Sequence, residues 1–209
     1  MIHKKKLEDL SSEELGKLFP IQIVPYDENW VEIFKSESTL IQDTLGNDIA
    51  LKIEHFGSTA VEGLSAKPTI DILVEIPPLT DNLKETVIKK MAAIDYIFIW
   101  RTDEKVPYMH FVKGYSPEGF KGNLFHIHMS DKTHPLWDRI FFRDYLRQNK
   151  RVATAYETLK ISLAEKYKFD REAYTEAKSE FIKRITEEAK ASALLSQDTK
   201  LADNTIKEI

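Results

Sequence analysis

The stretch HFGSTAVEGLSAKPTIDILVEI, residues 55–76, joins a turn of small residues to an apolar strand that carries carboxylates. Gly57 allows the backbone to turn tightly, and Ser58 and Thr59 supply hydroxyls beside exposed N–H groups, which suits an anion such as phosphate. Asp71 follows on the strand, where a carboxylate costs free energy unless it is paired or binds a cation. Together these features indicate metal-assisted handling of a nucleotide.

Motifs in this stretch and beyond it resemble the signature of the GrpB family, which is assigned to the nucleotidyltransferase superfamily. The matching residues are His55, Gly57 to Val61, Gly63 and Leu64, Ala66 to Pro68, Ile70 to Ile72, Phe111 to Gly114, His126 to His128, Phe142 to Arg147, Tyr156 to Ala164, Tyr174, Lys178 and Phe181. The resemblance covers residues 21–190. It implies metal-dependent transfer of a nucleotidyl group from a nucleoside triphosphate to an unknown acceptor.

The sequence departs from the superfamily pattern at one carboxylate. Members place a Gly-Ser turn against the triphosphate and two carboxylates one residue apart on the next strand, where two divalent ions act. Here Asp71 matches the first carboxylate, but Leu73 occupies the place of the second. Glu75 shares the face of Asp71 but lies about 13 Å from it along an extended strand, too far for one ion to bridge.

Two histidines offer a different metal site. His126 and His128 have i, i+2 spacing and share one face of a strand, and we expect that strand to neighbour Asp71. Two imidazoles and a carboxylate would favour a transition metal or zinc over magnesium. We predict Asp71, His126 and His128 as the catalytic and metal-binding residues of a site for Mg²⁺, Mn²⁺ or Zn²⁺. The histidines could instead act as acid and base, or be hydrogen-bonded parts of the structure.

Several cations could bind phosphate. Lys67 stands just before the strand, and Arg143 and Arg147 are four residues apart on a predicted helix and share a face. Asp144 is expected to point away from these arginines and to neutralise them little. The predicted phosphate-binding residues are Gly57, Ser58, Thr59, Lys67, Arg143 and Arg147. For the helical arginines, the alternative is a solvated charged surface.

Hydrophobic periodicity predicts an α/β (α+β) fold, with a nucleotidyltransferase-like mixed sheet flanked by helices and a helical C-terminal third. Helices are predicted at 7–18, with a capping box at Ser11 and Glu14, at 27–45 and 80–93, and beginning near 136, 152 and 173. Residues 21–24 are predicted as a short strand or an extended entry. Strands are predicted at 51–56, 69–76, 96–101, 107–114 and 124–129, the last two as a hairpin across residues 116–123.

These elements suggest a helical extension at 1–20 and one domain at 21–190, followed by a polar tail at 191–209 whose last residues fray. The domain would consist of an α/β core at 21–132 and a helical part at 133–190. Tyr174 and Lys178, one helical turn apart, could close over the sheet and contribute to specificity.

Composition limits the function classes further. The 209 residues include no Cys, which excludes disulfides and thiolate metal sites or nucleophiles, and the formal charge of -4 argues against a general nucleic-acid coat. The absence of a signal-peptide pattern or long apolar run predicts a cytoplasmic protein that does not bind membranes. The expected partner is a nucleotide or phosphorylated small molecule, and the oligomeric state is left open.

Two other functions remain open. One is a catalytically silent module that binds a nucleotide or phosphorylated metabolite, which the loss of a carboxylate at Leu73 favours. Fusion of some family members to dephospho-coenzyme A kinase implies a coenzyme A connection for such a module. The other, weaker alternative is metal-dependent hydrolysis at Asp71, His126 and His128.

Overall fold

The apolar strand that follows Pro68 lies inside a five-stranded sheet, in a computed structural model that describes residues 7–101 and 106–206. The strands are β1 (Lys52–Phe56), β2 (Thr69–Glu75), β3 (Ile97–Arg101), β4 (Tyr108–Ser116) and β5 (Gly119–Ser130). Their spatial order is β1-β2-β5-β4-β3; β2 and β5 run parallel, and the other neighbouring pairs are antiparallel. The predicted mixed sheet is therefore confirmed.

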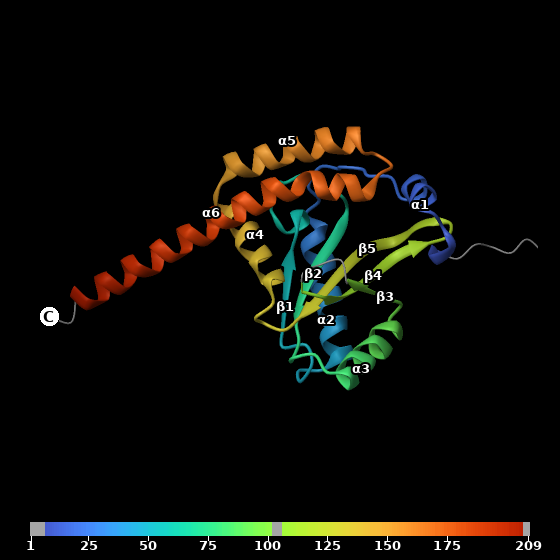
Figure 1. The fold of residues 1–209 in the computed structure, drawn as a ribbon, viewed down its shortest axis with the longest axis horizontal. Helices are drawn as coiled ribbons and strands as arrows, with labels where there is room; N and C mark the ends of the chain where they lie inside the picture. The colour runs from blue at the N-terminus through green and yellow to red at the C-terminus, as the bar shows by residue number, and fades with distance from the viewer. Residues whose placement is uncertain (1–6, 102–105, 207–209) are drawn as a thin grey trace, which may run out of the picture.

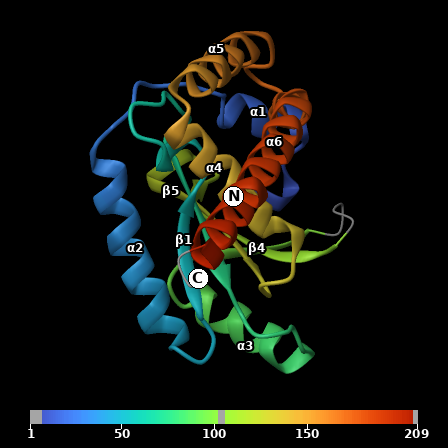
Figure 2. The ribbon, with the colours of Figure 1, turned by 90° about the vertical axis from the view of Figure 1, so that its left-hand side faces the viewer.

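Helices cover both faces of this sheet (Figure 1; Figure 2). The α-helices are α1 (Ser12–Leu18), α2 (Asn29–Leu45), α3 (Asp81–Ala92), α4 (Asp138–Gln148), α5 (Lys150–Lys166) and α6 (Arg171–Ile206), and the short 3-10 helices are η1 (Leu7–Asp9), η2 (Ser58–Ala60) and η3 (Pro135–Trp137). The main core lies between the sheet and α2 and α3. On the other face, η3 and α4 pack against Phe56, Leu73 and Tyr108.

The central strand β2 is buried on both faces. Ile72, Leu73 and Val74 have no exposed surface, although successive side chains point to opposite sides of the sheet. A nearly continuous apolar run is typical of a strand between two covering layers. Asp71, which keeps 28% of its side-chain surface exposed, is therefore an exception on this strand.

The helical C-terminal third is confirmed, and its last helix continues into the predicted polar tail. α5 and α6 pack on each other, and the last part of α6 extends beyond the rest of the molecule (Figure 1). Residues 196–206, where fraying is predicted, continue α6 to Ile206, and the predicted fraying stays a prediction. Neither Gly nor Pro occurs there, so the backbone meets no strong helix breaker.

Near the N-terminus, one prediction is wrong and one of two alternatives is confirmed. The helix predicted at 7–18 is divided into η1 and α1, because Ser11 forms the predicted capping box with Glu14 and so begins a new helix. Of the two alternatives for residues 21–24, the structure shows the extended entry, with a single bridge between Val24 and Ala66. This segment has one pairing position and no adjoining strand to extend it.

The β4–β5 hairpin is confirmed, but its strands are longer than predicted. The turn expected at 116–123 is confined to the residues between Ser116 and Gly119, which are Cα partners. Gly114, Gly119 and Gly122 all have positive φ, which lets both strands bend and continue. Among the helices in the described ranges, none has the length and hydropathy that a bilayer-spanning segment requires.

Candidate functional site

The register of β2, β5 and β4 aligns titratable side chains on one face of the sheet. Asp71 is the Cα partner of His126 across the parallel pair, and Leu73 is the partner of His128. His110, in β4, is also a partner of His128. Because Cα partners point to the same face, Asp71 shares a face with three imidazoles. The expected proximity of Asp71 and the His126 strand is confirmed.

The three imidazoles form a candidate metal site. One nitrogen each from His110, His126 and His128 lies within 4.8 Å of the other two. Two nitrogens that bind one zinc ion at about 2.1 Å lie at most about 4.2 Å apart, so small ring rotations would complete the site. The donor set of three neutral imidazoles fits zinc or a first-row transition metal.

Neighbouring groups orient these rings. The Tyr115 hydroxyl is hydrogen-bonded to His126 Nε2 at 2.8 Å, while His126 Nδ1 lies 3.7 Å from Asp71 Oδ1. His128 Nδ1 is hydrogen-bonded to the Tyr108 hydroxyl at 3.3 Å. Burial holds the pKa of His126 and that of His128 well below the usual value, so both rings are neutral at pH 7 and can donate a lone pair to a metal.

The sequence-based prediction named His126 and His128 but missed His110. His110 belongs to a strand with Tyr108 and Val112 on the same face, and nothing in that alternation marks it as a ligand. Only its pairing with His128 brings it into the group. Asp71 lies beside His126 without belonging to the triad, so its predicted role as a metal ligand stays a prediction.

We expect His110→Ala to lower bound zinc from about one ion per chain to less than about a tenth of that. A structural site that loses one of three protein ligands loses most of its affinity. The measurement is metal content by mass spectrometry after loading and dialysis, with His134→Gln as a control because His134 bonds the Val106 carbonyl instead. Unchanged metal content in both His110→Ala and His126→Ala would exclude the triad as the binding site.

Gly57 is packed directly against Asp71. Its φ of 74° is one that glycine adopts readily, and a Cβ built on Gly57 would lie 2.3 Å from Asp71 Oδ2. Only glycine fits, because any other residue would combine an unfavourable φ with a collision. Although Asp71 is partly exposed, burial raises the pKa of its carboxyl to about 6, and the nearby cations Lys67 and Arg139 oppose this rise.

The two predicted hydroxyl ligands have different surroundings. Thr59 is buried, and its Oγ1 donates to the Thr69 carbonyl at 3.2 Å and is hydrogen-bonded to His55 Nε2 at 3.0 Å. That hydroxyl holds η2 against β1 and β2. Ser58, in contrast, lies near the hydroxyl of Tyr156 from α5, whose pKa burial raises and Ser58 lowers. The predicted phosphate-binding roles of both residues stay predictions.

Lysines from distant parts of the chain surround Asp71. Lys67 Nζ lies 5.4 Å from the ring centroid of Tyr174 in α6, and Lys178 Nζ lies 4.1 Å from the same ring. Burial lowers the pKa of Lys67 to about 8 and that of Lys178 to about 7, and neighbouring cations add to both shifts while Asp71 opposes them. A bound polyanion would stabilise the charged forms of these lysines.

A buried lysine holds the loop that carries the half-buried Lys67. Lys160, in α5, is 2% exposed and donates to the carbonyl of Ser65, whose N–H donates to Glu157 at 2.8 Å. Two α5 side chains thus fix both backbone groups of Ser65, two residues before Lys67. No local sequence pattern predicts this contact, because it joins residues far apart in the chain.

Lys160 should make stability depend on pH. Burial lowers its folded-state pKa to about 7, against 10.5 as the ordinary value, so the unfolded chain binds more protons between pH 7 and 10.5. Stability therefore rises with pH across that window. We expect Lys160→Met to remove this dependence, so that urea unfolding at pH 6 and pH 10 differs by roughly 3 to 5 kcal/mol less than in the parent.

The matched control is Lys166→Met, which removes an exposed lysine from the same helix. It should leave the pH profile unchanged. Loss of the bond to Ser65 adds a nearly constant cost of about 1 kcal/mol to Lys160→Met. Parallel profiles for Lys160→Met and the parent would show that Lys160 is not held in a neutral state.

The two arginines predicted to bind phosphate donate hydrogen bonds to acceptors within the protein. Arg143 is buried and bonds Glu54 Oε2 at 2.7 Å, the His55 carbonyl at 2.8 Å and Asp144 at 2.7 Å. Arg147 donates to the Ala60 carbonyl from Nε and from a terminal nitrogen. The expectation that Asp144 points away from both is wrong, because the side chains bend back along the helix surface. These bonds fix the end of β1 and η2, and phosphate binding by either arginine stays a prediction.

The position of the missing carboxylate is apolar. Leu73 has no exposed surface and packs with Phe56, Tyr108 and Leu136. Glu54, its Cα partner in β1, is paired with Arg143 and with Lys52. Among the described residues on this face, Asp71 is therefore the carboxylate that adjoins the imidazoles, and no second carboxylate is paired with it.

Comparison with known proteins assigns the chain to a family. The family model described as GrpB protein matches residues 20–188. This chain belongs to the GrpB family. Two relatives in the family are the UPF0157 protein PA4798 of Pseudomonas aeruginosa, 39% identical over 82% of this chain and 69% of that protein, and the glutamate-rich protein GrpB of Alkalihalophilus pseudofirmus, 33% identical over 79% of this chain and 94% of that protein.

The GrpB fold is also known from a solved structure. The crystal structure of conserved protein GrpB from Enterococcus faecalis superposes on this chain with a TM-score of 0.71 at 31% identity. The match covers 83% of this chain and 99% of that one. The resemblance seen in the sequence is therefore confirmed, while the names of these GrpB relatives state no activity.

Proposed function

We propose that this GrpB protein transfers a nucleotidyl group from a nucleoside triphosphate to an acceptor hydroxyl, with a divalent metal. The observation that carries the proposal is the convergence on Asp71 of a glycine turn and two lysines. Gly57 approaches Asp71 so closely that only glycine fits, and Lys67 and Lys178 lie against Tyr174 nearby. Backbone N–H groups of a tight turn and cations suit a triphosphate.

In the proposed reaction, the acceptor oxygen attacks the α-phosphorus, the bond from that phosphorus to the bridging oxygen breaks, and pyrophosphate leaves. Asp71 accepts the acceptor's proton, since its raised pKa of about 6 is close to physiological pH. Lys67 and Lys178 neutralise the departing pyrophosphate. A metal held by His110, His126 and His128 would supply Lewis-acid stabilisation of phosphoryl charge.

The test is incubation of the protein with each nucleoside triphosphate and Mg²⁺, Mn²⁺ or Zn²⁺, followed by product analysis. Slow transfer to water should release nucleoside monophosphate and pyrophosphate in equal amounts. Nucleoside diphosphate with orthophosphate would instead identify a hydrolase that acts at the γ-phosphate, which is the weaker alternative. If neither set of products forms with any of these metals, the proposed catalysis is contradicted.

A second candidate is a module that binds nucleotides or coenzyme A precursors without turnover. The buried apolar surroundings of Leu73 favour it, because a two-ion reaction lacks a bridging carboxylate there. A thermal-shift panel of nucleotides and coenzyme A precursors, with and without metal, separates the two. Metal-dependent stabilisation by triphosphates supports the enzyme, and metal-independent stabilisation supports the binding module.

A further inference from the structure

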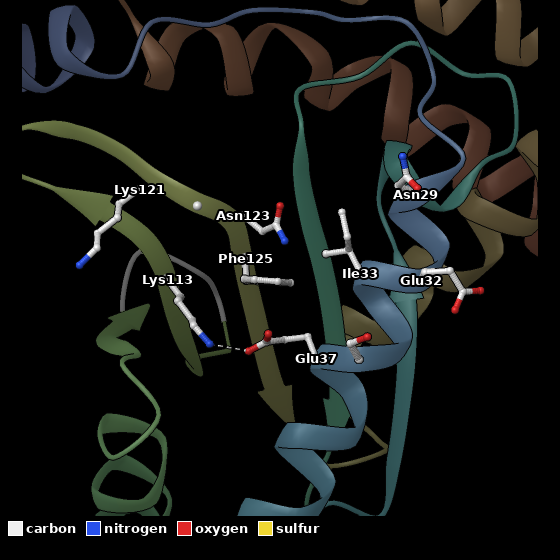
Figure 3. Close-up of a pocket in the computed structure, with 10 residues that line it drawn as sticks. Asn29, Glu32, Ile33, Glu37, Lys113, Lys121, Asn123 and Phe125 are labelled. Atoms are coloured by element: carbon white, nitrogen blue, oxygen red, sulfur yellow. Dashed lines mark hydrogen bonds and ion pairs between the residues drawn. The ribbon is translucent and has the colours of Figure 1, made fainter.

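A groove lies on the opposite face of the sheet from Asp71, between α2 and the β4–β5 hairpin (Figure 3). It consists of two adjoining cavities, of about 480 and 230 Å³, which share Ile33, Gly122 and Asn123. Cavities of about 300 to 1,000 Å³ are typical of sites for small organic molecules. Phe125 lines the groove, while the next residue, His126, points to the other face, so the groove is separate from the proposed catalytic site.

The two cavities differ in chemistry. The larger is lined by two acids and two lysines, together with neutral polar side chains such as Asn123; the charged residues are Glu32, Glu37, Lys113 and Lys121. The smaller is lined mostly by apolar side chains and by one acid, Asp27; the apolar residues are Trp30, Ile33, Pro68, Ile70, Phe120 and Leu124. The groove therefore has a polar end with two acids and two lysines beside a mainly apolar end that also carries Asp27.

A fixed ion pair forms the wall of the polar end. Lys113 Nζ donates to Glu37 Oε1 at 2.9 Å, and the Tyr96 hydroxyl donates to the same oxygen at 2.9 Å. The Lys113 ammonium also lies 5.1 Å from the Tyr96 ring and 5.7 Å from the Phe125 ring. Figure 3 shows both charged side chains pointing toward each other across the groove. The bonds described for this pair use one N–H of Lys113 and one oxygen of Glu37, so each group can also bind a ligand.

We propose that this groove binds a free α-amino acid with a large apolar side chain. The ligand's ammonium would donate to Glu37 Oε2, and its carboxylate would accept from Lys113 and the Asn123 amide. Its side chain would occupy the mainly apolar cavity beside Trp30 and Ile70. A zwitterion matches the balanced charge of the polar end, whereas a singly charged ligand leaves one partner of the ion pair without compensation.

The first test is a titration of the ¹⁵N-labelled full chain, followed by two-dimensional NMR, with L-phenylalanine and L-tryptophan as probes. Saturable shifts should appear at Ile33, Gly122 and Asn123. N-acetyl-L-phenylalanine, which lacks the ammonium, and L-phenylalaninamide, which lacks the carboxylate, should each bind at least tenfold more weakly. The readout is binding alone, so its result is independent of the proposed transferase activity.

Variants test the location. Ser36→Trp fills the polar cavity and should weaken L-phenylalanine binding at least tenfold, while Thr39→Trp, on the same helix but outside the groove lining, should leave it unchanged. Lys113→Met removes the partner of the ligand's carboxylate and should reverse the preference, so that L-phenylalaninamide binds more tightly than L-phenylalanine. A merely structural role of Lys113 predicts no such reversal.

Three results would overturn the proposal. One is the absence of saturable shifts in the groove at probe concentrations up to the solubility limit. The second is equal binding of the zwitterion and either singly charged analogue. The third is a binding response of the wrong kind. Either the amino acids shift only residues outside the groove, or nucleotides shift the groove residues and amino acids do not.

Discussion

Asp71→Asn is expected to lower the rate of nucleotide turnover by about 100- to 1,000-fold, which is typical for the loss of one preorganised charged group in an active site. The amide has nearly the shape of the carboxylate, so it still fits beside Gly57, but it can neither accept a proton nor carry the charge that faces Lys67 and Lys178. The measurement is kcat for release of pyrophosphate from the preferred triphosphate.

The matched control for this substitution is Glu75→Gln, which changes a carboxylate on the same strand and the same face. Because Glu75 lies at the far end of β2, beside Lys52 and Ser130, its amide should leave kcat within about twofold. Both variants should unfold within about 1 kcal/mol of the parent. A kcat of Asp71→Asn equal to that of the parent would remove Asp71 from the proposed mechanism.

Leu73→Asp is expected to destabilise the protein by about 3 to 5 kcal/mol, because it buries an unpaired charge. Leu73 has no exposed surface, Phe56 and Leu136 beside it offer no polar group, and its Cα partner His128 is neutral and cannot balance the charge of a carboxylate. The substitution restores, in sequence but not in environment, the second carboxylate that is expected at this position. The measurement is the free energy of unfolding in urea, together with pyrophosphate release in Mg²⁺.

Leu73→Met is the control, since a volume-conserving apolar change costs less than about 1.5 kcal/mol. If Leu73→Asp kept the parent's stability and gained activity with Mg²⁺, position 73 would be a ligand position after all. In that case the single-carboxylate mechanism proposed here would be replaced by a two-ion mechanism.

Much of the fold follows from local pattern. The alternation and apolar runs at β1, β2, β4 and β5 predict strands, and the turn at Gly57 and the end of α2 at Gly46 follow from glycine's tolerance of positive φ. The ends of strands are predicted less well where glycines favour a turn but strand pairing favours an extended backbone. The glycines of residues 116–123 predict a loop, yet pairing with β4 keeps most of this segment extended.

The candidate site was predicted only in part, for a physical reason. The cations predicted from helix spacing, Arg143 and Arg147, bind protein acceptors, whereas Lys160 holds the Ser65 backbone through a contact between residues 95 positions apart. Helical spacing shows which side chains share a face. It does not show which groups contact that face, because tertiary packing places α4 and α5 against η2 and the loop before β2.

The sequence alone determined that a glycine turn precedes a strand with one carboxylate, that the expected second carboxylate is a leucine, and that metal ligands must be His, Asp or Glu because Cys is absent. The tertiary structure decided which histidines form a group. The parallel pairing of β2 with β5 sets Asp71 beside His126, and the antiparallel pairing of β4 adds His110. A shift of one residue in either register would turn these side chains to the opposite face, so strand pairing, and not local spacing, assembles the site.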